Sequence, residues 1–153
     1  MTASPRPSRP RVVEFGFWAL VAGAVLLVFG GLIAATVTFE TARPAVDPEM
    51  SNDQLRDYLT VYRGMGIGAV VAGGLLAFLA SKARRGDSNF RRATIGLSLA
   101  IAVVLVLLAV GAGLGQPVTL LALVPIAVGT VLLTRRSAAG WFDQGEADDE
   151  PVR

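Results

Sequence analysis

The sequence predicts an all-α protein, an integral membrane bundle of four transmembrane helices with both termini in the cytoplasm. Hydrophobic residues make up 53% of the 153 residues. They fall into four blocks, each close to the length that crosses about 30 Å of hydrocarbon. Basic residues gather in the segments that flank these blocks on one side, a pattern typical of cytoplasmic loops. We therefore expect a multi-pass protein of the bacterial inner membrane.

A basic loop between the second and third blocks decides the predicted orientation. It contains five of the fourteen Lys and Arg residues. Three basic residues precede the first block, three follow the fourth, and three lie on the opposite side, so eleven are predicted inside and three outside. The loop side chains are also expected to lie among anionic lipid head groups. These topology and head-group residues are Lys82, Arg84, Arg85, Arg91 and Arg92.

The chain begins with a segment that does not favour a helix. Residues 1–12 are rich in Pro and Arg and predict a flexible cytoplasmic arm. The first span is expected at about 13–39, because its apolar run from Phe15 to Phe39 is 25 residues long. A signal-peptide core has roughly 7–15. Small residues on this span favour close helix packing: Ala19, Gly23, Gly30 and Ala34.

The longest polar connection, from Glu40 to Tyr62, is expected to be extended in its first half, where Pro44 and Pro48 lie. Its second half predicts a helix, because Ser51 and Gln54 have the spacing of a capping box. Four side chains then recur at helical spacing on one face: Leu55, Tyr58, Leu59 and Tyr62. This amphipathic helix either docks a partner or rests on lipid head groups.

The second span is predicted at about 60–81 and is rich in glycine. Gly64 and Gly68 form a GxxxG pair, Ala72 continues their face, and Gly73 follows. Glycine destabilises a helix relative to alanine, so its density favours close contact with another helix. We expect these four residues to pack on a helix of this chain or of a partner.

The third and fourth spans, at about 93–112 and 118–134, predict an antiparallel hairpin with an uncharged turn. Pro117 suits the first position of the last helix, and Pro125 should kink it. The four spans together form a membrane domain at 13–136. The acidic segment 137–153 is expected to be a disordered cytoplasmic tail.

Composition argues against several functions. The chain has no Cys and no His, so haem, zinc and iron–sulfur binding are disfavoured and no cofactor is expected. No charged residue falls near the centre of a predicted span, whereas transporters and proton pumps keep such groups at membrane depth. No nucleophile and base pair is evident, so we expect no enzyme. Membrane lipids, and not nucleic acid, are the expected partners of the basic residues.

Three stretches resemble small four-span membrane proteins of actinobacteria: Arg9 to Trp18, Leu59 to Gly64, and Phe90 to Thr94. Some proteins of this kind are accessory components of the cytochrome bc–aa3 respiratory supercomplex, including an association factor. The resemblance implies the same four-span architecture and names this supercomplex as one candidate partner. It carries over no catalytic residue.

The sequence therefore favours a non-catalytic accessory or assembly subunit of a multi-subunit inner-membrane complex, with larger membrane subunits as partners. Two alternatives stay open. One is a small homo-oligomeric transporter or channel whose pore is lined by Thr and Gly. The other is a free-standing membrane protein that binds an extracytoplasmic partner through the amphipathic outer helix.

Overall fold

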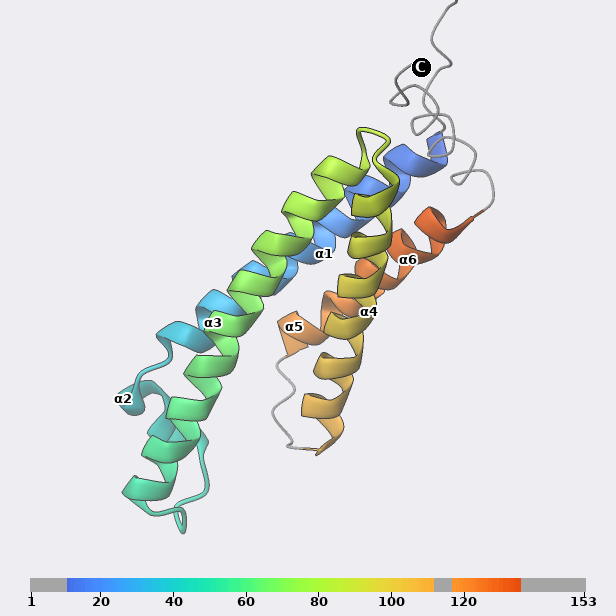
Figure 1. The fold of residues 1–153 in the computed structure, drawn as a ribbon. Coiled ribbons are helices and arrows are strands. Elements are labelled where there is room, and N and C mark those ends of the chain that lie inside the picture. The colour runs from blue at the N-terminus through green and yellow to red at the C-terminus, as the bar shows by residue number, and fades with distance from the viewer. Residues whose placement is uncertain (1–10, 112–116, 136–153) are drawn as a thin grey trace, which may run out of the picture.

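The computed structural model describes residues 11–111 and 117–135, and every regular element in this part of the chain is helical (Figure 1). Four helical segments of the described chain are long and apolar enough to cross a membrane, which confirms the predicted all-α, four-span architecture. The elements are α1 (Arg11–Thr36), α2 (Phe39–Ala42), the 3₁₀ turn η1 (Arg43–Ala45), α3 (Asn52–Ala83), α4 (Ser88–Gly111), α5 (Pro117–Leu121) and α6 (Leu123–Thr134).

Helix α1 is the centre of the bundle, because it packs against α3, α5 and α6. Its closest approach to α3 is at Gly31 and Gly66, where two backbones meet. A Cβ atom added to Gly31 would lie 2.5 Å from the carbonyl oxygen of Gly66, and one added to Gly66 would lie 2.6 Å from that of Gly31. Any side chain at either position would therefore force the two helices apart.

A second glycine face of α1 receives the last span. A Cβ on Gly23 would collide with the Ile126 side chain, and one on Gly30 would lie 2.5 Å from the Thr119 hydroxyl oxygen. From the other side, a Cβ on Gly129 would lie 2.6 Å from Leu20 Cγ. The small residues that were expected to allow close packing on the first span thus do so, at Gly23 and Gly30.

The connection between α1 and α3 differs from the prediction. Helix α1 ends at Thr36 instead of near residue 39. The following segment is not extended, because α2 and η1 occupy its first half. Thr38 caps α2 in a capping box with Thr41, and the Arg43 guanidinium donates a 2.8 Å hydrogen bond to the Met50 carbonyl oxygen. These polar contacts fold a proline-containing segment into two tight turns.

The helix starts follow local capping signals. Ser51 and Gln54 form the predicted capping box of α3, which runs without interruption into the second span. Helix α4 begins at Ser88, five residues before the predicted third span. There the Asp87 carboxylate accepts hydrogen bonds from the backbone amides of Asn89 and Phe90, at 3.0 and 3.1 Å. Gly86, with φ of 99°, makes the preceding turn possible.

The fourth span begins at Pro117, as predicted, and is divided into α5 and α6 at Ala122. Pro125 causes the break. Proline has no amide hydrogen, so it cannot bond to the carbonyl of Leu121, four residues earlier. The helix is therefore interrupted at the end of α5 and not at the proline itself.

The glycine contacts predict opposite effects for the same substitution at two sites on α3. Gly66→Ala should lower the free energy of unfolding by about 1–3 kcal/mol, because the new Cβ overpacks the contact with α1. Gly64→Ala should raise it by up to about 1 kcal/mol, because Gly64 is exposed and an added Cβ meets no atom within 4 Å. Unfolding in one detergent, followed by circular dichroism, measures both. Shifts of the same sign would contradict this packing.

Candidate functional site

The predicted packing residues of α3 divide between two faces of the helix. Gly73 is buried, and a Cβ placed there would lie 2.9 Å from the Ala24 carbonyl oxygen on α1. Gly64 and Gly68 are exposed, and an added Cβ at either one meets nothing within 4 Å. Neither glycine is therefore in direct contact with another described helix, although Gly68 lines the opening between α3 and α4.

The geometry of an α-helix explains this division. Residues two positions apart lie about 200° apart around the helix, so Gly66 and Gly64 cannot face the same neighbour. The glycine that contacts α1 is Gly66, which sequence analysis did not select. Its signal was present in the sequence, since Gly66 and Gly73 are seven residues apart and share a face. From the sequence alone, the face with Gly64 and Gly68 and the face with Gly66 and Gly73 are equally plausible contact surfaces, because the position of the neighbouring helix is unknown.

The amphipathic face of α3 is only partly available to a partner. Leu55 and Leu59 are 0% and 4% exposed, so they are buried within the chain. Tyr58 is 40% exposed, and its ring stacks on that of Tyr62 at 5.9 Å between centroids. The exposed residue of the predicted interface is therefore Tyr58, and Tyr62 is half-buried beside it.

Two residues of the basic loop tie helices together. Arg84 forms an ion pair with Glu14 on α1, and its guanidinium lies 4.6 Å from the centre of the Phe17 ring. Arg91 donates two hydrogen bonds to the Leu133 carbonyl oxygen, at 3.0 and 2.8 Å. That carbonyl lies in the last turn of α6, where helix carbonyls have no intrahelical partner. Arg84 and Arg91 thus connect helices of the bundle, in addition to any contact that they make with lipid.

The other three basic residues are more available to lipid. Lys82 is half-buried and lies 5.8 Å from the centre of the Phe78 ring. Arg85 and Arg92 are exposed and pair with no described residue. A hollow of about 330 Å³ lies at the end of the bundle that holds the α3–α4 turn, and it is lined by Phe17, Ser81, Arg84 and Arg85. The expectation of head-group contact fits Arg85 and Arg92 best, since neither is engaged within the described chain.

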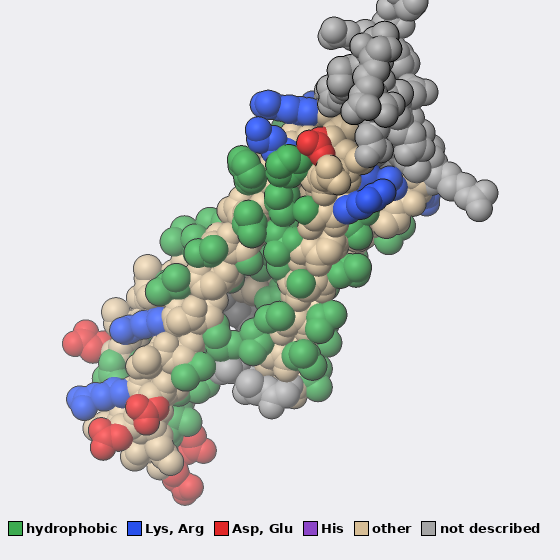
Figure 2. Space-filling view, viewed as in Figure 1, with side chains coloured by type: hydrophobic (Ala, Val, Ile, Leu, Met, Phe, Trp, Pro, Cys, Tyr) green, Lys and Arg blue, Asp and Glu red, His purple; other side chains and the backbone are tan. Residues whose placement is uncertain are grey.

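An apolar crevice separates α3 from α4 away from their connecting turn. It has a volume of about 390 Å³, and all its lining side chains are hydrophobic or glycine. Gly68 and Ala72 lie on its α3 wall, and Leu97 and Ala100 on its α4 wall. Its floor reaches Leu27 of α1, which is 1% exposed. Figure 2 shows hydrophobic side chains along both sides of this part of the surface.

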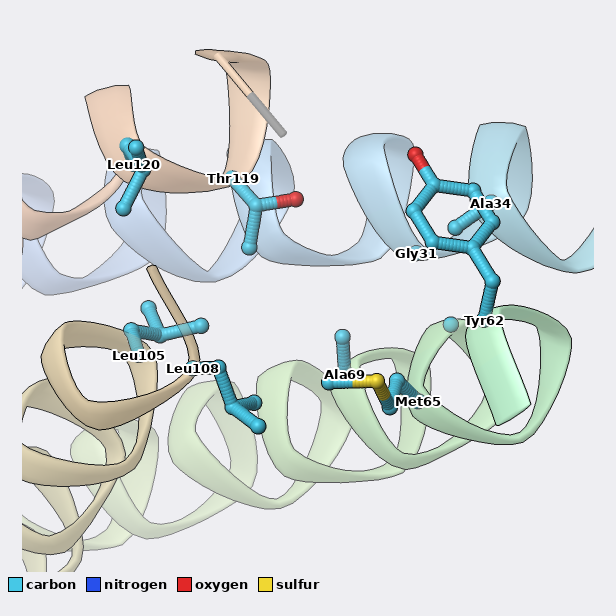
Figure 3. A pocket seen from close by; sticks show the side chains of 10 residues that line it. Gly31, Ala34, Tyr62, Met65, Ala69, Leu105, Leu108, Thr119 and Leu120 are labelled. Atoms are coloured by element: carbon cyan, nitrogen blue, oxygen red, sulfur yellow. The ribbon is translucent and has the colours of Figure 1, made fainter. Parts of the chain in front are cut away.

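A smaller chamber of about 50 Å³ continues the crevice toward α1 and α5 (Figure 3). The two spaces share Met65, Ala69, Leu105 and Leu108. Two hydroxyl-bearing residues line the small chamber: Tyr62 of α3 and Thr119 of α5. Figure 3 shows both side chains beside α1, near Gly31 and Ala34. Predictions from sequence named Tyr62 as a surface residue and did not include the crevice.

Residues 11–111 and 117–135 contain no group of three or more acidic side chains placed to hold a metal ion. That the chain binds no cofactor and catalyses no reaction stays a prediction. Comparisons with models of protein families, with curated proteins and with solved structures find no match for this chain. The resemblance to actinobacterial four-span proteins therefore also stays a prediction.

The Arg91 contact predicts a measurable stabilising role. Arg91→Met keeps most of the aliphatic stem and removes both hydrogen bonds to Leu133. We expect it to lower the free energy of unfolding by about 1.5–3 kcal/mol, as for hydrogen bonds to charged groups. Arg92→Met is the matched control, since Arg92 is exposed and pairs with no described residue, and should change stability by less than about 0.5 kcal/mol. Equal effects in detergent unfolding would show that Arg91 does not hold α6.

Proposed function

We propose that this chain is a non-catalytic accessory or assembly subunit of a multi-subunit complex of the bacterial inner membrane. One observation carries the proposal. Gly64 and Gly68 are four residues apart, share a face of a membrane-spanning helix and are exposed, and an added Cβ at either one meets nothing within 4 Å. Each glycine costs about 1 kcal/mol of helix stability relative to alanine. In lipid, small residues favour close approach of a second helix, and here that helix belongs to a partner.

The outer end of α3 supports the proposal with a second exposed surface. The helix extends past the end of α4 toward α2 (Figure 1). This extension presents Tyr58 and the exposed acidic residues Asp53 and Asp57. Tyrosine is enriched at protein interfaces because its ring is apolar and its hydroxyl can bond to water or a partner. A partner subunit can therefore be contacted both within the membrane and at its surface.

The resemblance noted in the sequence makes the cytochrome bc–aa3 respiratory supercomplex the first complex to test. The function itself depends on the exposed glycines and not on this choice of complex. The resemblance is the only support for the respiratory assignment.

Both termini and the α3–α4 turn are proposed to lie in the cytoplasm. Among the described residues, the end of the bundle that holds this turn carries most of the cations (Figure 2). These are Arg11, Lys82, Arg84, Arg85, Arg91, Arg92 and Arg135. The opposite end carries Arg43, Arg56 and Arg63 together with five acidic residues of the α2 region and early α3. This asymmetry supports the orientation, because basic segments resist translocation.

Single cysteines test the orientation, since the chain has none of its own. Asp53→Cys and Asn89→Cys both replace exposed side chains. In intact cells from which any outer barrier has been removed, a membrane-impermeant thiol reagent should label the cysteine at position 53 and not that at position 89. Lysed cells, in which both should react, provide the control. Labelling only at position 89 would show that the assignment is inverted.

Co-purification tests the proposed function. The tagged chain, isolated in mild detergent from its native host, should bring down larger membrane subunits near one-to-one. Replacing Gly64 and Gly68 together with Leu should reduce that recovery at least tenfold, because the new side chains prevent close helix contact. Gly96→Leu on α4 is the control, since Gly96 is also exposed and an added Cβ there meets nothing within 4 Å.

The same experiment separates the alternatives. Recovery of the chain alone, with ion or solute flux after reconstitution, would favour the homo-oligomeric transporter or channel. Recovery with a soluble extracytoplasmic protein would favour the free-standing binding protein. Unchanged recovery of partner subunits with the double variant would show that Gly64 and Gly68 are not the docking surface.

A further inference from the structure

The crevice between α3 and α4 has the size and composition of a ligand site. Its volume of about 390 Å³ falls within the range of about 300–1,000 Å³ that is typical of small-molecule pockets. Its lining is hydrophobic throughout, from Gly68 and Ala72 on one wall to Leu97 and Ala100 on the other. In a membrane-spanning bundle such a space is open to the hydrocarbon of the bilayer and not to water.

The length of the space matches one leaflet. Tyr62 lines the small chamber and Ala72 the large one, and ten residues separate them on α3. A helix rises 1.5 Å per residue, so this part of α3 is about 15 Å long. The hydrocarbon core of a bilayer is about 30 Å thick. A single chain of one leaflet therefore has the right length to extend from the small chamber to the inner end of the crevice.

The depth of the crevice favours a hydrocarbon chain over a partner helix. Its floor is Leu27, a side chain that is only 1% exposed. An α-helix with its side chains is about 10–12 Å across, too wide to reach a residue so deeply covered. A lipid chain is a few atoms wide and can fill such a space.

The polar groups of this space are confined to one end. Tyr62 and Thr119 are the two hydroxyl-bearing residues that line the small chamber. The Tyr62 hydroxyl has no hydrogen-bond partner among the described residues, whereas Thr119 has a polar interaction of its own. One available phenolic hydroxyl at the end of an apolar channel suits a ligand with a hydrocarbon tail and a head group that forms hydrogen bonds.

Charge at the same end of the bundle selects among such ligands. Between positions 39 and 63 lie five carboxylates and three guanidinium groups, and the Arg63 guanidinium donates a hydrogen bond to the Val37 carbonyl oxygen. The carboxylates are Glu40, Asp47, Glu49, Asp53 and Asp57. An anionic phosphate head group would be repelled by this excess of negative charge, whereas an uncharged head group would not.

We propose that the crevice binds one neutral lipid, with one hydrocarbon chain between α3 and α4 and its uncharged, hydrogen-bonding head group beside Tyr62. This inference goes beyond the accessory-subunit function, because it concerns the opening between α3 and α4. Gly68 lies on the α3 wall of that opening and Gly64 does not line it, so Gly64→Leu alone tests the partner contact without filling the crevice. The lipid is a component of the folded protein in the membrane.

Native mass spectrometry of the full chain in mild detergent tests the proposal. The probes are dioleoylglycerol and dioleoylphosphatidylglycerol, which share their chains and differ in charge. The wild type should retain one dioleoylglycerol per chain, at least tenfold more than the anionic lipid. Ala72→Phe and Ala100→Phe, which fill the crevice from its two walls, should each lower retention at least tenfold. The neighbouring Val71→Phe and Gly96→Phe are matched controls, since both residues are exposed and neither lines the space.

Tyr62→Phe tests the head-group contact with little change in volume. It should lower dioleoylglycerol retention several-fold and leave the unfolding temperature in detergent unchanged. Equal retention by all variants, or preference for the anionic lipid, would overturn the proposal. A dimer that Ala72→Phe dissociates would also overturn it, by showing that a second copy fills the crevice. A partner helix in the crevice would appear as co-purification that is lost in Ala72→Phe and kept in Gly64→Leu.

Discussion

The contact between the α1 and α3 backbones at Gly31 and Gly66 is the constraint on which the bundle depends. Lipid tails are as apolar as the side chains, so burial from water does not drive helices together within a bilayer. Close packing and polar contacts must do so, and both need short distances between helices. The missing side chains of Gly31 and Gly66 allow α1 and α3 to meet at backbone distance. Because α1 also receives α5 and α6, its position organises the other spans.

Arginine side chains that donate hydrogen bonds to carbonyl groups at or just after helix ends complete this arrangement. Arg63 donates a 2.8 Å hydrogen bond to the Val37 carbonyl oxygen just after α1, and Arg91 bonds to that of Leu133 near the end of α6. Terminal carbonyls that lack such partners are costly near hydrocarbon. Helix α4 is held near its first turn, by Asp87 and by Arg91. The crevice between α3 and α4 opens beyond the first turn of α4. The contacts that hold this turn in place therefore also set where a lipid can enter.

The two proposals use adjoining surfaces of one helix, which meet at Gly68. The face of α3 that carries Gly66 and Gly73 contacts α1, whereas Gly64 lies about 200° away from Gly66. Next to Gly64, Gly68 lies on the wall of the crevice together with Met65, Ala69 and Ala72. A partner helix on the glycine face and a lipid between α3 and α4 would be neighbours in the same membrane layer. A bound lipid would then form part of the surface that a partner contacts.

The sequence by itself determined the features that depend on residue type and local spacing. The length and polarity of each block defined four spans, Ser51 and Gln54 marked the start of α3, and Pro117 marked that of the last span. Which face of each span lies inward was decided only by tertiary structure. Periodicity places Gly64 with Gly68 and Gly66 with Gly73, but lipid-facing and buried surfaces are both apolar, so hydrophobicity cannot tell them apart. The crevice arises from the divergence of α4 from α3, which no local sequence pattern encodes.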